Sequence, residues 1–125
     1  MRKMKRPARY FLLVPEGIIR YGSEVTDEGW LDVYVDSDWA GCRTSRKSTS
    51  GGMLCWAGGL LKSWARTQGT TAMSSGEAEF YAGIKGAAEG LGMQSLLKDL
   101  GCEVQVRLHQ DSTAARGVNS RIGIG

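Results

Sequence analysis

Residues 31–38 alternate between apolar and polar positions with a period of two. Leu31, Val33 and Val35 occupy one set of positions, and the positions between them hold aspartate and tyrosine. A period of two is typical of a β-strand that buries one face and exposes the other. The pattern therefore predicts a strand whose valines and leucine belong to a core, with Asp36 at the end of the apolar run.

Two further strands are predicted at residues 51–57 and 60–67. The pair Gly58-Gly59 lies between them, and two adjacent glycines are a signal for a tight hairpin turn. The polar residues 43–50 would connect the first strand to this hairpin. Together the three strands predict an antiparallel meander.

A helical period replaces the alternation after residue 73. Ser74 and Glu77 have the spacing of a capping box, which predicts a helix beginning at Ser74. Two stripes then repeat at helical spacing, and the stripe of small residues lies on the same side as Glu79. Each interior glycine costs a helix roughly 1 kcal/mol relative to alanine, so three of them predict close packing against the sheet. The apolar stripe is Phe80, Ile84, Ala87 or Ala88, and Leu91; the small-residue stripe is Ala82, Gly83, Gly86 and Gly90.

Shorter signals predict the remaining elements of the domain. A second helix is predicted at residues 93–100 with Gly101 as its C-terminal cap, followed by a fourth strand at residues 104–108. Asp111 resembles an N-cap that opens a last helix. The helical crossover makes the fourth strand parallel to the first. The expected class is α/β, with a mixed sheet that carries helices on its faces.

Residues 1–29 differ from the rest of the chain, and their sequence predicts a basic leader. Residues 1–14 predict a short basic helix that ends before Pro15, and residues 15–29 predict turns around a short strand. Residues 30–125 would form the domain itself. A chain of 125 residues with 42% hydrophobic side chains suffices for one compact core.

Charge and cysteine content indicate which partners and which cellular compartment the protein suits. The formal charge is +3, and basic residues gather before the first acid and again in the polar connection. Such clusters suit phosphate backbones, although each taken alone also fits a solvated surface. The 3 cysteines are widely spaced and indicate reduced thiols in an intracellular protein, and the apolar run at residues 10–14 is too short to span a membrane. The clusters are Arg2, Lys3, Lys5, Arg6 and Arg9, and then Arg43, Arg46 and Lys47.

Three carboxylates lie where the predicted elements would bring them to one place. Asp36 ends the first apolar run, Glu79 lies inside the helix, and Asp111 follows the fourth strand. Carboxylates gathered from distant segments repel unless a cation neutralises them, and hard cations such as Mg²⁺ take oxygen ligands. Each also has an ordinary structural explanation, as a turn-former, a surface acid and an N-cap. Glu77 points about 200° away from Glu79 and is explained by the capping box.

Four short segments surround these acids, and their order along the chain forms a recognisable series. They are Asp36-Ser37-Asp38-Trp39-Ala40-Gly41, Arg46-Lys47-Ser48-Thr49-Ser50-Gly51, Ser74-Ser75-Gly76-Glu77-Ala78-Glu79-Phe80, and Asp111-Ser112. The series resembles the ribonuclease H domain of copia-type (long-terminal-repeat) retrotransposon polyproteins. The first and third segments together are specific to that branch. The basic start also looks like the tail of the connection that follows a reverse transcriptase.

The resemblance implies an RNase H fold with a mixed five-stranded sheet and helices on both faces. It also implies an endonuclease that uses Mg²⁺, with Mn²⁺ as an alternative, to cut the RNA strand of an RNA–DNA hybrid. Asp36, Glu79 and Asp111 fall on the family's first three catalytic, metal-binding positions. Contacts from the polar connection to phosphates would come from Arg43, Arg46, Lys47 and Ser48.

The implied partners are the RNA–DNA hybrid and the reverse transcriptase portion of the same polyprotein, with no membrane. The implied location is intracellular, either cytoplasmic within a virus-like particle or nuclear. The sequence departs from the family at its end, because the family carries a fourth acid near a histidine and residues 112–125 contain no Asp, Glu or His. A truncated domain is therefore expected, without its last strand and closing helix. Two alternatives remain: an inactive or domesticated module that binds nucleic acid, and a structural domain that packs on a reverse transcriptase.

Overall fold

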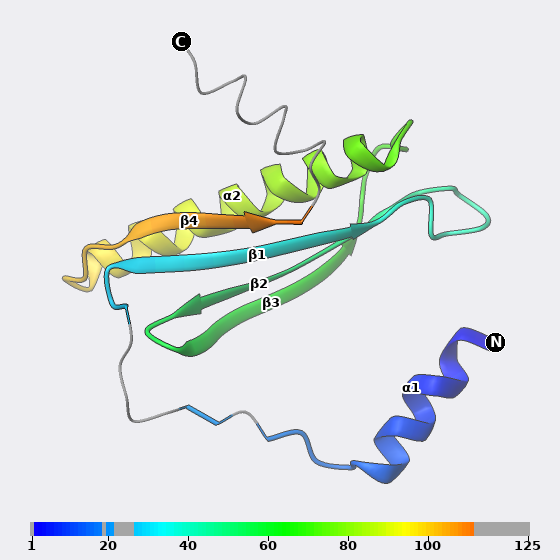
Figure 1. Cartoon of the computed structure of the whole chain (residues 1–125), viewed down its shortest axis with the longest axis horizontal. Coiled ribbons are helices and arrows are strands. Elements are labelled where there is room, and N and C mark those ends of the chain that lie inside the picture. Colours follow the sequence, from blue (N-terminus) through cyan, green and yellow to red (C-terminus); the bar gives the residue numbers. More distant parts are fainter. Residues whose placement is uncertain (1, 19, 22–26, 112–125) are drawn as a thin grey trace.

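The computed structural model describes residues 2–18, 20–21 and 27–111, and Figure 1 shows a sheet with one long helix along one of its faces. The four strands are ordered β3-β2-β1-β4, with β1 antiparallel to β2 and parallel to β4. This mixed sheet confirms the predicted α/β class and is consistent with an RNase H-like fold. The elements are α1 (Arg2–Leu13), β1 (Trp30–Asp38), β2 (Thr49–Trp56), β3 (Gly59–Thr67), α2 (Ser75–Asp99) and β4 (Gln105–Gln110).

The central strand β1 shows the alternation that its sequence predicts. Leu31 and Val33 are fully buried and Val35 is 7% exposed, whereas Asp36 is exposed. Leu54 on β2 is fully buried beside them. The core therefore lies between α2 and the two middle strands of the sheet, and the even-numbered residues of β1 face the other way.

β2 and β3 form the predicted hairpin, but its turn lies one residue earlier than expected. The pairing of Trp56 with Gly59 leaves Ala57 and Gly58 as the two loop residues, with φ of 51° and 82°. Positive φ at both central positions matches the right-handed twist of a two-residue hairpin. Gly59 is instead the first residue of β3, where a Cβ would lie 2.7 Å from the ring of Tyr21. The glycine pair located the hairpin but not its central residues.

α2 is one continuous helix, so the prediction of two separate helices was wrong. It passes through Gly92, where the break was expected, and continues to residue 99. Gly90 before this point and Leu97 after it are both buried against the rest of the domain. Packing on both sides outweighs the modest cost of one interior glycine.

The C-terminal end of α2 confirms Gly101 as the capping glycine. Gly101 has a φ of 86°, and its N–H donates to Lys98 O (3.0 Å). The N–H of Cys102 donates to Leu97 O (2.8 Å). These two bonds form a Schellman motif, which needs a left-handed residue at the position of Gly101 and so favours glycine there.

The stripe of small residues on α2 packs against the sheet, as predicted. A Cβ added at Gly86 would lie 2.3 Å from Val35 Cγ1, and one added at Gly90 would lie 2.7 Å from a methyl carbon on β4. Only a residue without a side chain allows this approach. The large apolar residues beside the stripe are more exposed, at 52% for Ile84 and 56% for Leu91. The glycines therefore form the buried face of the helix.

The N-terminal helix α1 confirms the helix predicted before Pro15, and its side chains from Lys5 onward are exposed. No strand occurs in the described part of residues 15–29, so the short strand expected there is not found. The helix predicted to follow Asp111 lies outside the described residues. Of the helices that the structure describes, none has the length and apolarity needed to cross a membrane.

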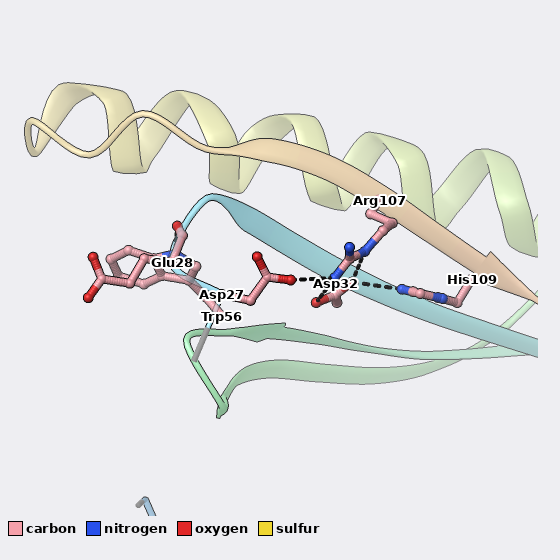
Figure 2. Close-up of polar contacts among 6 residues, drawn as sticks. All are labelled: Asp27, Glu28, Asp32, Trp56, Arg107 and His109. Atoms are coloured by element: carbon pink, nitrogen blue, oxygen red, sulfur yellow. Dashed lines mark hydrogen bonds and ion pairs between the residues drawn. The ribbon is translucent and has the colours of Figure 1, made fainter. Parts of the chain in front are cut away.

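A charged cluster of Asp27, Asp32, Arg107 and His109 connects β1 to β4 on the face opposite α2 (Figure 2). Arg107 Nε donates to Asp32 Oδ1 (2.6 Å), and Arg107 Nη2 donates to Asp32 Oδ2 (3.1 Å) and Asp27 Oδ2 (2.9 Å). His109 Nε2 lies 2.7 Å from Asp32 Oδ1, and its ring stacks on Tyr34. The hydrogen bonds from Arg107, and then from His109, hold the pKa of the Asp32 carboxyl below its usual value.

Replacing Asp32 by asparagine is expected to lower the free energy of unfolding by about 1 kcal/mol at neutral pH, because the charged hydrogen bonds are lost. The folded-state pKa of Asp32 lies below its ordinary value of 3.8. Its stabilisation is therefore complete above the unfolded-state pKa and is lost as the pH falls through the folded-state pKa. Urea unfolding of wild type and variant should show a gap at neutral pH that closes in strong acid.

The matched control for this prediction is Glu103→Gln, which removes an exposed carboxylate outside the cluster. Its free energy of unfolding should stay within about 0.5 kcal/mol of wild type at neutral pH. A gap between wild type and Asp32→Asn that has the same size at neutral and at strongly acidic pH would contradict the assigned role of the carboxylate.

Candidate functional site

Ser37 joins the end of β1 to the first turns of α2. Ser37 Oγ donates to Glu79 Oε1 (2.8 Å), and the Ser37 N–H donates to Asp36 Oδ1 (2.8 Å). Ser37 continues the series of buried residues on β1, so its hydroxyl points toward the helix. One serine therefore contacts two of the three predicted acids, which lie far apart in the sequence.

The start of α2 gives Glu77 and Glu79 different partners, as the capping box predicted. Ser74 Oγ accepts from Glu77 N–H (3.1 Å), and the Glu77 carboxylate accepts from Met73 N–H (2.7 Å) and from the Tyr81 hydroxyl (2.9 Å). In a capping box the glutamate side chain normally accepts from the N–H of the N-cap residue. Here it accepts from the N–H of Met73, and not from that of the N-cap residue Ser74. The hydrogen bond to Glu77 raises the pKa of Tyr81. Glu77 belongs to the helix cap, and Glu79 faces the end of β1.

The parallel pairing of β1 with β4 brings Asp111 next to Asp36 along the backbone. The register pairs Val35 with Gln110, and neighbouring strands of a sheet lie about 4.8 Å apart, so Asp36 inside β1 lies beside the position where Asp111 directly follows β4. Gln110 Nε2 also donates to Glu79 O (2.8 Å) and fixes the start of α2 against the end of β4. The backbones of all three acids therefore reach the same end of the sheet.

The three carboxylates do not form one group in this structure. Among the described residues, no set of three or more His, Cys, Asp or Glu side chains is placed to hold a metal ion. β1 continues through Asp38, so Asp36 is not at the end of the strand, and its exposed side chain faces away from Val35. The three acids' donor set of oxygens alone fits a hard cation such as Mg²⁺.

The connection between β1 and β2 is held by hydrogen bonds of its own. Asp38 Oδ1 accepts from the Thr49 N–H, and Ser48 Oγ accepts from the Ala40 N–H (2.9 Å). Ser48 is fully buried, so its hydroxyl supports the connection from inside. The other three residues predicted to contact phosphates lie nearer the surface: Arg43 and Arg46 are exposed, and Lys47 is half-buried.

Two residues of this region were not identified from the sequence as part of the site. Ser37 and Gln110 hold Glu79 through its side chain and its carbonyl oxygen, respectively. Both are polar residues that continue the core-facing positions of their strands, after the buried Val35 on β1 and after the partly buried Leu108 on β4. A polar residue at the end of a buried series needs a hydrogen-bond partner, and this signal was available in the sequence.

The chain is similar to proteins of several organisms, and no protein-family model matches it. It is 38% identical over 89 residues to an uncharacterized mitochondrial protein of Arabidopsis thaliana, covering 69% of this chain and 35% of that protein. It is 38% identical over 81 residues to the secreted RxLR effector protein 161 of Plasmopara viticola, covering 63% of this chain and 54% of that protein.

The third similarity is to the retrovirus-related Pol polyprotein from transposon TNT 1-94 of Nicotiana tabacum. The identity is 32% over 71 residues, which cover 57% of this chain and 5% of the polyprotein. The chain thus spans from a small fraction to about half of the length of these relatives. The similarities support an origin in a transposon polyprotein.

Proposed function

We propose that the chain carries a metal-dependent ribonuclease H activity from a transposon polyprotein and cuts the RNA strand of RNA–DNA hybrids. The observation that carries the proposal is the link from Asp36 through Ser37 to Glu79, beside the neighbouring position of Asp111. The mixed sheet and the similarity to a transposon Pol polyprotein support it. The reverse transcriptase portion of the same polyprotein is the proposed protein partner.

In this proposal Asp36, Glu79 and Asp111 would hold Mg²⁺, with Mn²⁺ as an alternative. A bound ion of this kind supplies an activated water and stabilises negative charge at the scissile phosphate. Ser37 orients the Glu79 carboxylate, and Gln110 fixes the first turns of α2, so that the acids come from rigid elements. The hybrid would be recognised by its backbone shape and its 2′-hydroxyl groups rather than by base sequence.

The test is a cleavage assay on the purified chain. A hybrid labelled on its RNA strand should be cut when Mg²⁺ is added, because the acids need the ion to act on the phosphate. EDTA should stop the reaction, and a DNA duplex of the same sequence should remain intact. Cleavage of the hybrid that continues in EDTA would overturn the metal-dependent proposal.

A second candidate function is nucleic-acid binding without catalysis. The observation that favours it is that the carboxylates are not gathered in the part of the chain that the structure describes. This function predicts salt-dependent binding of the hybrid and no turnover at any concentration of Mg²⁺ or Mn²⁺. A domain that only packs on a reverse transcriptase would show neither binding nor cleavage by itself.

A further inference from the structure

A pocket of about 300 Å³ opens between α2 and the edge strand β3. α2 packs over β1, β2 and β4, and β3 extends beyond this packed region. The pocket takes side chains from the end of β3, from the connection that follows it and from the outer side of α2. The residues that matter here are Arg66, Thr67, Gln68, Thr70, Tyr81 and Lys85.

Positive charge predominates in this pocket. Arg66 and Lys85 both line it, and no carboxylate residue does. The Arg66 side chain makes no hydrogen bond or ion pair with any described residue. Lys85 Nζ lies 2.7 Å from Glu89 Oε1, but Glu89 also binds Lys62 and is shared between two lysines. The pocket therefore presents cationic groups that its own surroundings do not neutralise.

The buried amide of Gln68 belongs to the wall of the same pocket. Gln68 is only 8% exposed, and its Nε2 donates to Ser50 Oγ (2.8 Å) and Ala78 O (2.8 Å). Because a carbonyl oxygen can only accept, the bond to Ala78 fixes which end of the amide is the NH₂ group. Gln68 Oε1 then has no partner among the described residues. A buried acceptor without a partner is uncommon, but this oxygen is closed off from solvent, so the cations and hydroxyl groups of the lining, and not Gln68 Oε1, are the groups that a ligand can contact.

The polar lining extends beyond the cations and the amide. The hydroxyl groups of Thr67 and Thr70 are exposed and make no hydrogen bond with any described residue. Tyr81 closes the side toward the helix start, where its own hydroxyl is committed to Glu77. Two free hydroxyls beside two cations match the oxygens of a phosphate.

We propose that this pocket binds a phosphate group of a nucleotide or of a nucleic-acid strand. The strand register pairs Ser37 with Ser50 and Ser50 with Arg66, so the pocket lies at the same end of the sheet as the Ser37–Glu79 contact, two strands away. This separation is about 10 Å, which one nucleic-acid strand covers within a few nucleotides. Binding in the pocket does not depend on the three acids or on a metal ion.

The test measures binding in EDTA, where no metal-dependent cleavage occurs. Inorganic phosphate and a short single-stranded RNA are titrated into the ¹⁵N-labelled chain, and backbone amide shifts of residues 66–70 are followed by NMR. Arg66→Gln and Lys85→Gln should each weaken binding of the RNA roughly three- to tenfold and reduce the salt slope of its affinity by about 0.7. Thermal unfolding of each variant verifies that it is folded.

Lys98→Gln is the matched control, because it removes the same charge from the other end of α2, outside the pocket. Shifts with both probes, weakened by the two pocket variants only, assign the pocket to a nucleic-acid strand. Shifts with phosphate alone, weakened by the same variants, assign it to a small phosphate ligand. Absence of shifts with either probe, or an equal effect of Lys98→Gln, overturns the site. Because the titrations contain no metal ion, their failure is distinguishable from failure of the proposed nuclease activity.

Discussion

Replacing Gly86 by valine is expected to lower the free energy of unfolding by about 3 kcal/mol or more. A Cβ at this position would lie 2.3 Å from Val35 Cγ1 and 3.2 Å from Leu108 Cδ1. These atoms belong to the packed core under α2, so they have little room to move. The helix would have to lift away from β1 and β4, and urea unfolding followed by tryptophan fluorescence measures the loss.

Gly92→Val is the matched control for this substitution. Gly92 lies on the same helix, and a Cβ added there meets no atom within 4 Å. Valine has a slightly higher helix propensity than glycine, so the control should change the free energy of unfolding by no more than about 0.5 kcal/mol. Equal losses for the two variants would show that the glycine stripe does not set the distance between helix and sheet.

Glu79→Gln is expected to reduce cleavage of the RNA strand by roughly a thousand-fold or more, if the proposed nuclease is correct. The substitution keeps the size of the side chain and its bond to Ser37, but it removes the charge that a metal ion requires. Asp111→Asn should have the same effect for the same reason. Initial rates of hybrid cleavage in Mg²⁺, with circular dichroism to verify folding, measure both losses.

Glu77→Gln provides the control on the same helix, two residues away. Glu77 binds Met73 N–H and the Tyr81 hydroxyl at the helix start, and glutamine at this position of a capping box retains most of that role. Its cleavage rate should therefore remain within about twofold of wild type. Similar losses for Glu77→Gln and Glu79→Gln would mean that the helix start as a whole, and not the Glu79 carboxylate, controls the rate.

Much of the fold could be predicted from local pattern because its main signals are strong. The period of two in β1 favours a strand with one buried face, and the glycine stripe of α2 favours close packing against a sheet. The structure shows both. The predicted break between two helices at Gly92 was wrong because it rested on local helix propensity alone. Tertiary packing of α2 outweighs that propensity. The predicted hairpin turn lay one residue too late in the sequence. A left-handed conformation at Ala57 is unusual for a residue with a side chain, so the sequence favoured the two glycines instead.

The candidate site could be predicted only at the level of the backbone. Strand and helix positions bring Asp36, Glu79 and Asp111 to one end of the sheet, and this follows from order and register. The directions of their side chains depend on hydrogen bonds such as that of Ser37, which span long sequence distances. Repulsion between acids depends further on whether a cation is present, and a sequence pattern does not specify that.

The parallel pairing of β1 with β4 determines when the domain can complete its folding during synthesis. Asp32 and Arg107, which join these strands, are separated by 75 residues. The meander of β1, β2 and β3 therefore leaves the ribosome first, with one edge of β1 still unpaired. Contacts over such distances form late because a long loop must close before they can be made. A chain cleaved before β4 had emerged would release an open strand edge, which readily pairs with other chains.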